Sequence, residues 1–128
     1  MNYYFTKTLN GDFEKAIEKV TDALKSEGFG VLTNIDLKTT LKNKLGVDFY
    51  HYKILGACNP TFAYKALQEE DKIGTMLPCN IIVQEREAGK IEIAAVDPVA
   101  SMQAIGNPAL KIVAGEVQKK LQHVINML

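Results

Sequence analysis

The two cysteines of this chain are the residues best suited to chemistry. Cys58 lies in the stretch "GACNP" and Cys79 in "LPCN", so each thiol stands beside an asparagine and close to a proline. Asn59 and Pro60 are typical of a helix start, because Asn accepts a hydrogen bond from a free backbone N–H and Pro needs no donor there. The positive end of that helix would favour a thiolate, which makes Cys58 the candidate catalytic nucleophile. The alternative is that Cys58 is a small apolar residue that fills a gap between strand and helix.

A predicted β-hairpin sets the surroundings of Cys79. A three-residue loop at 87–89, with glycine in the left-handed position, pairs Arg86 with Lys90, Val83 with Ile93 and Ile81 with Ala95. This register gathers the apolar residues on one face, and its extension places Cys79 opposite Asp97. The Asp97 carboxylate would raise the pKa of the thiol and could accept its hydrogen bond. The alternative is that Cys79 packs in the core while Asp97 caps the turn that begins at "DPVASM".

The distance between the two thiols depends on how two predicted strands pair. The helix after Cys58 favours a right-handed β-α-β crossover between parallel strands, which places Cys58 and Cys79 at opposite ends of the sheet. The connection at 71–78 spans about 26 Å when extended, however, which is enough to return the chain to the Cys58 end. We expect the separated arrangement. On a continuous strand His51 lies roughly 23 Å from Cys58, so it is excluded as the base of a local Cys-His pair.

The elements that position these residues follow from hydrophobic periodicity. Alternation indicates strands and a three-to-four-residue repeat indicates helices, with Gly28 and Gly46 as helix ends. The predicted strands are 2–9, 29–37 with one buried face, 47–57, 79–86 and 90–97, and the predicted helices are 13–27, 38–45, 60–70 and a long C-terminal helix from Pro108. Residues 71–78 are predicted to be a loop.

The order of these elements indicates an α+β fold. It runs β-α-β-(α)-β-α-β-β-α, which predicts a two-layer sandwich with a mixed five-stranded sheet covered by two or three helices. The β-α-β units indicate some parallel pairing, and the hairpin indicates some antiparallel pairing. No linker or shift in composition divides the chain, so residues 1–128 are predicted to form a single domain.

Composition excludes several classes of function. Fifteen basic and fifteen acidic residues cancel without gathering into a patch, so we expect no nucleic-acid partner. No apolar run is long enough to cross a bilayer, and "MNYYFTKTLNGDFEK" lacks the features of a secretion signal, so we expect a cytoplasmic protein with free thiols and no membrane partner. Phosphate-loop and dinucleotide fingerprints are absent, and the cysteine spacing is not that of a metal site, so we expect no cofactor and no metal.

Three stretches in this order resemble a known family. "LGACNPTFAYKAL", "IGTMLPCNIIV" and "AAVDP", together with "GFGVLTNIDLKTTLKNKLGVDF", are similar to the bacterial and archaeal family catalogued as domain of unknown function 302. The resemblance implies an α+β domain and brings no established catalytic activity. The positions that match are Cys58, Asn59, Pro60, Pro78, Cys79, Asn80, Asp97 and Pro98, and the family assigns no role to any of them.

These observations leave several hypotheses of function open. The leading one is a small ligand-binding or accessory module, and a homo-oligomer such as a dimer, with a small-molecule site built from Cys58, Asn59, Cys79, Asn80 and Asp97. The first alternative is a thiol-dependent redox or nucleophilic enzyme that uses Cys58, with Cys79 as the resolving thiol. A further alternative is a structural or protein-interaction domain with no small-molecule site. Soft-metal binding ranks last, because two thiolates are too few ligands unless a dimer supplies others.

Overall fold

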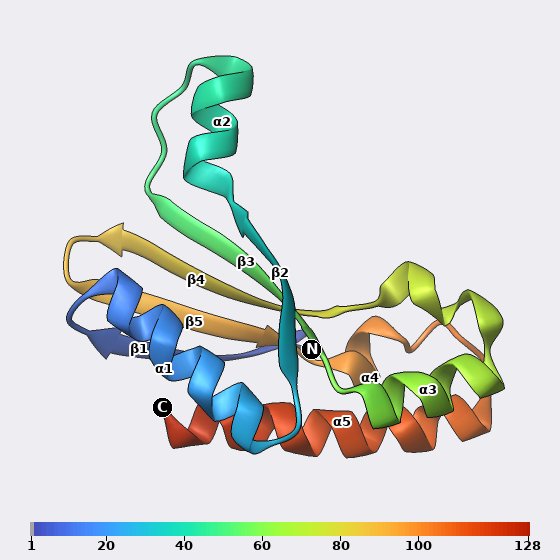
Figure 1. Cartoon of the computed structure of the whole chain (residues 1–128). Coiled ribbons are helices and arrows are strands. Elements are labelled where there is room, and N and C mark those ends of the chain that lie inside the picture. The colour runs from blue at the N-terminus through green and yellow to red at the C-terminus, as the bar shows by residue number, and fades with distance from the viewer. Residues whose placement is uncertain (1) are drawn as a thin grey trace.

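The protein is a five-stranded sheet with all of its helices but α2 packed on one face or at one end. The structure is a computed structural model and describes residues 2–128. The strands are β1 (Tyr4–Asn10), β2 (Gly30–Asp36), β3 (His51–Cys58), β4 (Cys79–Glu87) and β5 (Lys90–Val96), and the helices are α1 (Phe13–Ser26), α2 (Leu37–Leu45), α3 (Pro60–Glu69), the 3₁₀ helix η1 (Asp71–Met76), α4 (Pro98–Ser101) and α5 (Pro108–Met127). Helices α1 and α5 lie against the sheet (Figure 1), which confirms the predicted α+β fold with five strands.

The strand pairing differs from the prediction of a mixed sheet. The strand order is β1-β5-β4-β3-β2, and all four neighbouring pairs are antiparallel. Helix α3 is therefore not a crossover between parallel strands. Instead, η1 and the residues after it bring the chain back to the end of the sheet at which β3 stops, so β4 runs in the opposite direction to β3. Helix α1 joins the two edge strands, which are not neighbours.

The core lies between the sheet and the helices α1 and α5. Alternate residues of β4 and β5 are fully buried, and they pack against fully buried residues of the two helices; the set is Ile81, Val83, Ile91, Ile93, Val20, Leu24, Leu121 and Val124. The C-terminal half of the long helix predicted from Pro108 is therefore part of this core. A second, smaller hydrophobic cluster contains Ala66, Ile73, Met102, Leu110 and Ala114.

The hairpin between β4 and β5 confirms part of the predicted register. Val83 pairs with Ile93 as expected, but Lys90 pairs with Glu87 rather than with Arg86. The turn is therefore two residues long and uses a positive φ of 80° at Gly89. The register shifts between Gln84 and Glu87, and this bulge absorbs the extra residue and restores the predicted pairing on the core face.

The segment formed by β2 and α2 projects from the molecule, and we call residues 30–50 the arm. The predicted buried face of this strand is wrong, because only the first two residues of β2 are partly buried and Leu37 begins α2. No residue of α2 is buried, and Figure 1 shows the helix standing away from the sheet. The strand predicted from residue 47 begins only at His51. The start of the arm packs on the core through Val31, whereas α2 stands beyond α1 and α5 and packs on neither of them.

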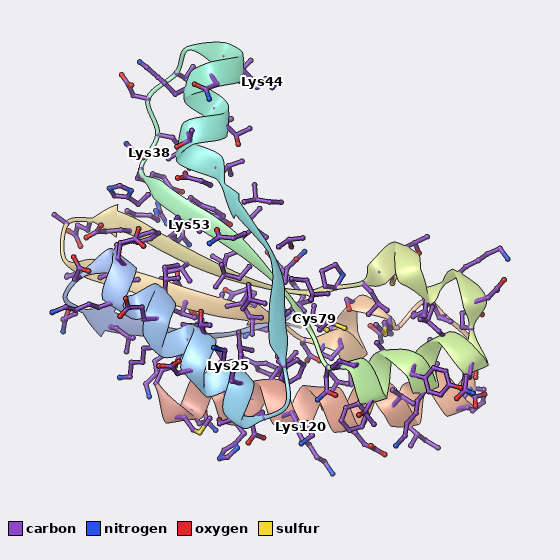
Figure 2. All side chains as sticks on the ribbon, viewed as in Figure 1. Lys25, Lys38, Lys44, Lys53, Cys79 and Lys120 are labelled. Carbon is purple, nitrogen blue, oxygen red and sulfur yellow. The ribbon has the colours of Figure 1, made fainter. Side chains whose placement is uncertain are left out.

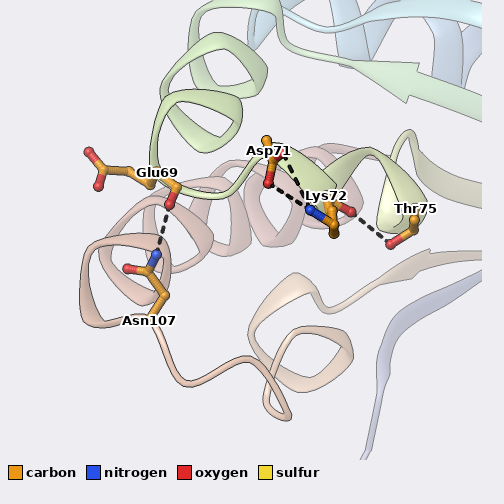
Figure 3. Close-up of polar contacts among 5 residues, drawn as sticks. All are labelled: Glu69, Asp71, Lys72, Thr75 and Asn107. Atoms are coloured by element: carbon orange, nitrogen blue, oxygen red, sulfur yellow. Dashed lines mark hydrogen bonds and ion pairs between the residues drawn. The ribbon is translucent and has the colours of Figure 1, made fainter.

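Helices at the opposite end of the sheet form a second packing unit, which we call the helical lobe: α3, η1, α4 and the first half of α5. The predicted loop at 71–78 contains η1, whose residue Ile73 is fully buried in the second cluster. Asn107 Nδ2 donates a hydrogen bond of 2.9 Å to the backbone oxygen of Glu69, and Thr75 Oγ1 donates one of 2.9 Å to that of Lys72 (Figure 3). The first of these bonds ties the start of α5 to the end of α3.

Candidate functional site

The two thiols lie at the same end of the sheet, so the predicted separation is wrong. Cys79 at the start of β4 is the register partner of Ala57, and Cys58 is the next residue along β3. Antiparallel pairing causes this proximity, because β3 ends where β4 begins. Both cysteines are free, as the sequence predicted; Cys79 is buried and Cys58 is half-buried.

Both cysteines line one narrow cleft between the end of the sheet and the helical lobe. Its volume is about 40 Å³, and its walls include Ala63 of α3, Met102 after α4 and Val113 of α5. Figure 2 shows Cys79 where the strands meet the helices of the lobe. Among residues 2–128, none of those that line the cleft carries a charge, and Asn59 brings the only amide side chain. The cleft therefore combines sulfur atoms with an apolar wall.

The Cys79 thiol keeps its proton at neutral pH. Burial raises its pKa to about 11, and the neighbouring Cys58 adds to this shift. The direction agrees with the sequence analysis, but the predicted cause, the carboxylate of Asp97, is wrong. A neutral thiol is a poor nucleophile, so Cys79 is suited to packing or to a ligand that displaces its proton.

Cys58 stands directly before the N-terminus of α3. Asn59 is the N-cap residue and Pro60 the first helical residue, as predicted, but the Asn59 side chain makes no capping hydrogen bond. Instead, Asn59 Nδ2 donates a hydrogen bond of 3.3 Å to the backbone oxygen of Glu27. The equivalent Asn107 of α5 does accept bonds from two backbone N–H groups. The first turn of α3 therefore lacks a side-chain acceptor close to Cys58, and it carries the positive end of the helix dipole.

Asp97 directly precedes Pro98, which lines the cleft, but Asp97 itself is not part of the lining. Its carboxylate caps α4 by accepting the N–H of Val99 at 3.0 Å, and it also accepts hydrogen bonds from Gln118 Nε2 at 3.1 and 3.2 Å. The capping role considered in the sequence analysis is confirmed. With these donors in place, Asp97 holds the end of β5 and α4 against α5.

Asn80 lies on the other face of the sheet from Cys79, because successive strand residues point to opposite faces. It is exposed and lines a hollow of about 420 Å³ together with Tyr3 and Tyr52. This hollow is on the sheet face opposite α1 and α5, which we call the open face. Asn80 is therefore apart from the two cysteines, and the five predicted site residues do not form one cluster.

Histidine takes no part in the cleft. The ring of His51 packs on that of Phe13 with 5.1 Å between centroids, at the end of β3 opposite to Cys58. The exclusion of a local Cys-His pair is consistent with this geometry. Among residues 2–128, no group of three or more His, Cys, Asp or Glu side chains is arranged to hold a metal ion.

Comparison with known proteins identifies the family. The family model described as "Domain of unknown function DUF302" matches residues 5–128. The chain belongs to the DUF302 family. The comparison with curated proteins gave no match. A crystal structure of an uncharacterized conserved DUF302 protein from Bacillus stearothermophilus has the same fold: the TM-score is 0.90, the sequence identity is 31%, and the match covers 98% of each chain.

One residue of this DUF302 domain was missed as a candidate by the sequence analysis. Met102 lines the same cleft as Cys58 and Cys79 and is only 7% exposed. The sequence indicates the place of Met102 only indirectly. The β4–β5 register brings Pro98 close to Cys79, and the single turn of α4 returns the chain at Met102 to the same region.

The DUF302 domain has helices of several lengths. Within the described residues, none of them combines the length and the apolar character that a bilayer-spanning helix needs. The longest, α5, contributes its apolar stripe to the core.

Proposed function

We propose that this DUF302 domain is a binding module and that its site is the cleft lined by Cys58 and Cys79. One observation carries the proposal: both thiols of the chain, from two different strands, line the same narrow apolar space. Asn59 belongs to this site, whereas Asp97 and Asn80 have other partners or another location.

The chemistry of the cleft supports binding better than acid–base catalysis. A general acid or base must titrate within hydrogen-bonding reach of the reacting group. Among the described residues, no His, Asp, Glu, Lys or Arg lines the cleft, and the raised pKa of Cys79 keeps that thiol neutral. The ligand that suits this cleft is therefore a small group that prefers apolar surroundings and contacts with sulfur.

The position of the cleft supplies a means of entry. Its walls come from both hydrophobic clusters: Ala57 and Val117 belong to the main core, whereas Ala66 and Leu110 belong to the smaller cluster. A small shift of α3 and η1 away from α5 opens the cleft without disturbing the packing of α1 and α5 on the sheet. Such local motions cost less free energy than global unfolding.

Xenon tests this proposal, because it is an apolar atom that enters dry cavities. Backbone NMR spectra recorded under xenon pressure should show shifts at Cys58 and Val113. The variant Ala63→Leu, which fills the cleft, should abolish them. Ala104→Leu makes the same change at an exposed position outside the cleft and should retain them. Shifts that persist in Ala63→Leu would reject the cleft as the site.

A thiol redox function is the second candidate, favoured by the proximity of Cys58 to Cys79. Cys58 is the more exposed thiol and stands at an uncapped helix end, so it is the attacking group, and Cys79 is the resolving one. This function would suit a reducing compartment such as the cytoplasm. Consumption of hydrogen peroxide at the expense of an added thiol, lost in Cys58→Ser but not in Met76→Leu, would support it; no consumption by the native protein would reject it.

A further inference from the structure

The size of the cleft limits its guest to an atom or an ion. A volume of about 40 Å³ is a few times the roughly 10–15 Å³ that a cavity needs to hold one water molecule, so only a small guest fits. Pockets for organic ligands are about ten times larger, roughly 300–1,000 Å³. The identity of such a small guest depends on the atoms that surround it. The step that follows rests on the proposed function of this same cleft.

Three sulfur-containing side chains surround the cleft. Cys58 comes from the end of β3, Cys79 from the start of β4, and Met102 from the end of α4. Cys79 and Met102 are 8% and 7% exposed, so both are held within the protein. Thiolate and thioether ligands are soft and select copper(I) among the common metal ions. We propose that the cleft binds one copper(I) ion through Cys58, Cys79 and Met102.

The other metals that bind cysteine do not fit this set. Structural zinc takes four ligands from Cys, His and carboxylate, and iron–sulfur clusters take four ligands that are Cys, or Cys and His. Calcium and magnesium require oxygen ligands, and no carboxylate lines the cleft among residues 2–128. Copper(I) is soft and accepts few ligands, so two thiolates and one thioether are sufficient.

Binding exchanges protons and leaves the oxidation state of the metal unchanged. The thiols of Cys58 and Cys79 each release a proton to solvent and form a sulfur–copper bond, and the metal remains copper(I). The site then carries one net negative charge, which an apolar cleft disfavours. The uncapped first turn of α3, next to Cys58, places the positive end of a ten-residue helix close to this charge. The released protons make the affinity rise with pH.

Competition with a coloured copper(I) chelator under anaerobic conditions tests this site in the full-length protein. The native protein should bind one copper(I) per chain, and X-ray absorption should show three sulfur neighbours. Cys58→Ser and Cys79→Ser should each weaken copper binding by more than about 100-fold. This exceeds the loss of metal affinity expected when a residue that only supports a ligand is removed, which reaches about 100-fold. Met102→Leu conserves side-chain volume and should weaken binding about tenfold and leave two sulfur neighbours.

Met76→Leu is the matched control, because Met76 is 40% exposed and lies outside the cleft. Its affinity and sulfur count should equal those of the native protein. Equal values for Met102→Leu and Met76→Leu would overturn the three-sulfur site, as would one copper per two chains. Xenon binding without copper binding would overturn the copper site and leave the proposed binding function in place. The absence of both would overturn both.

Discussion

A single proton on Cys79 links the chemistry of the cleft to the stability of the protein. Burial raises the pKa of this thiol from 9.0 to about 11, so between these values the native state holds a proton that the unfolded chain has released. At neutral pH the thiol is almost wholly protonated in both states, so its contribution to stability is constant there. The stabilisation is therefore present at neutral pH and is lost as pH rises toward 11.

The free energy of unfolding should fall by about 2 kcal/mol between pH 9 and pH 11 through this group alone. Urea denaturation of the native protein and of Cys79→Ala across this range measures the effect as the difference between the two slopes. Cys58→Ala serves as the control, because Cys58 is the more exposed thiol. This variant should keep most of the fall in the free energy of unfolding. Parallel profiles for native protein and Cys79→Ala would show that burial does not hold the proton.

Glycine is required at one position of the fold and lowers stability at another, and the two positions give a pair of predictions. A Cβ at Gly56 of β3 would lie 2.7 Å from Pro78 Cγ and closer still to Thr33 Oγ1, so only glycine fits between the neighbouring strands. A Cβ at Gly115 of α5 would meet no atom within 4 Å. The same substitution should therefore have opposite effects at the two positions.

Gly56→Ala should lower the free energy of unfolding by about 1–3 kcal/mol, because Pro78 and Thr33 must move. Gly115→Ala should raise it by about 0.5–1 kcal/mol, because glycine is a poor helix former. Chemical denaturation of both variants checks the pair. A stabilised Gly56→Ala protein would contradict the close packing of β2, β3 and the residues before β4.

The elements also show which parts of the structure follow from sequence. Helices α1 and α5 and the β4–β5 hairpin carry their own periodicity, so they were predicted with nearly correct bounds. The pairing of β3 with β4 depends on the path of η1, whose six residues have no such period. The proximity of Cys58 to Cys79 depends on that path, and the place of Met102 depends in addition on α4. The cleft therefore could not be assembled from local patterns alone.

The whole molecule has one sheet face that its own helices leave uncovered. On this open face the register aligns Ile35, Ile54, Ile82 and Ala94 in a row across β2, β3, β4 and β5. The arm adds Leu32 and Leu45, each 69% exposed. The face and the arm belong to the same chain, so two copies related by a twofold axis can cover both surfaces at once. We propose a homodimer that buries this face.

Ile82→Lys tests the dimer, because it places a charge at the centre of the row. Sedimentation should show a dimer for the native protein and a shift toward monomer for this variant, since an unpaired charge in an interface costs several kcal/mol. Ile112→Lys makes the same change at a residue of α5 that is 67% exposed, and it should remain a dimer. A native protein that is monomeric at all concentrations would contradict the proposal.

Cys58 and Cys79 share one cleft, and disulfide formation between them tests this placement. A disulfide requires two Cα atoms about 4.4–6.8 Å apart. Mild oxidation of the native protein, followed by mass spectrometry of the digested chain, should give one intrachain Cys58–Cys79 disulfide that a reductant reverses, with the circular dichroism spectrum unchanged. Separate oxidation of each thiol, or disulfides between chains, would contradict the shared cleft and the binding site built on it.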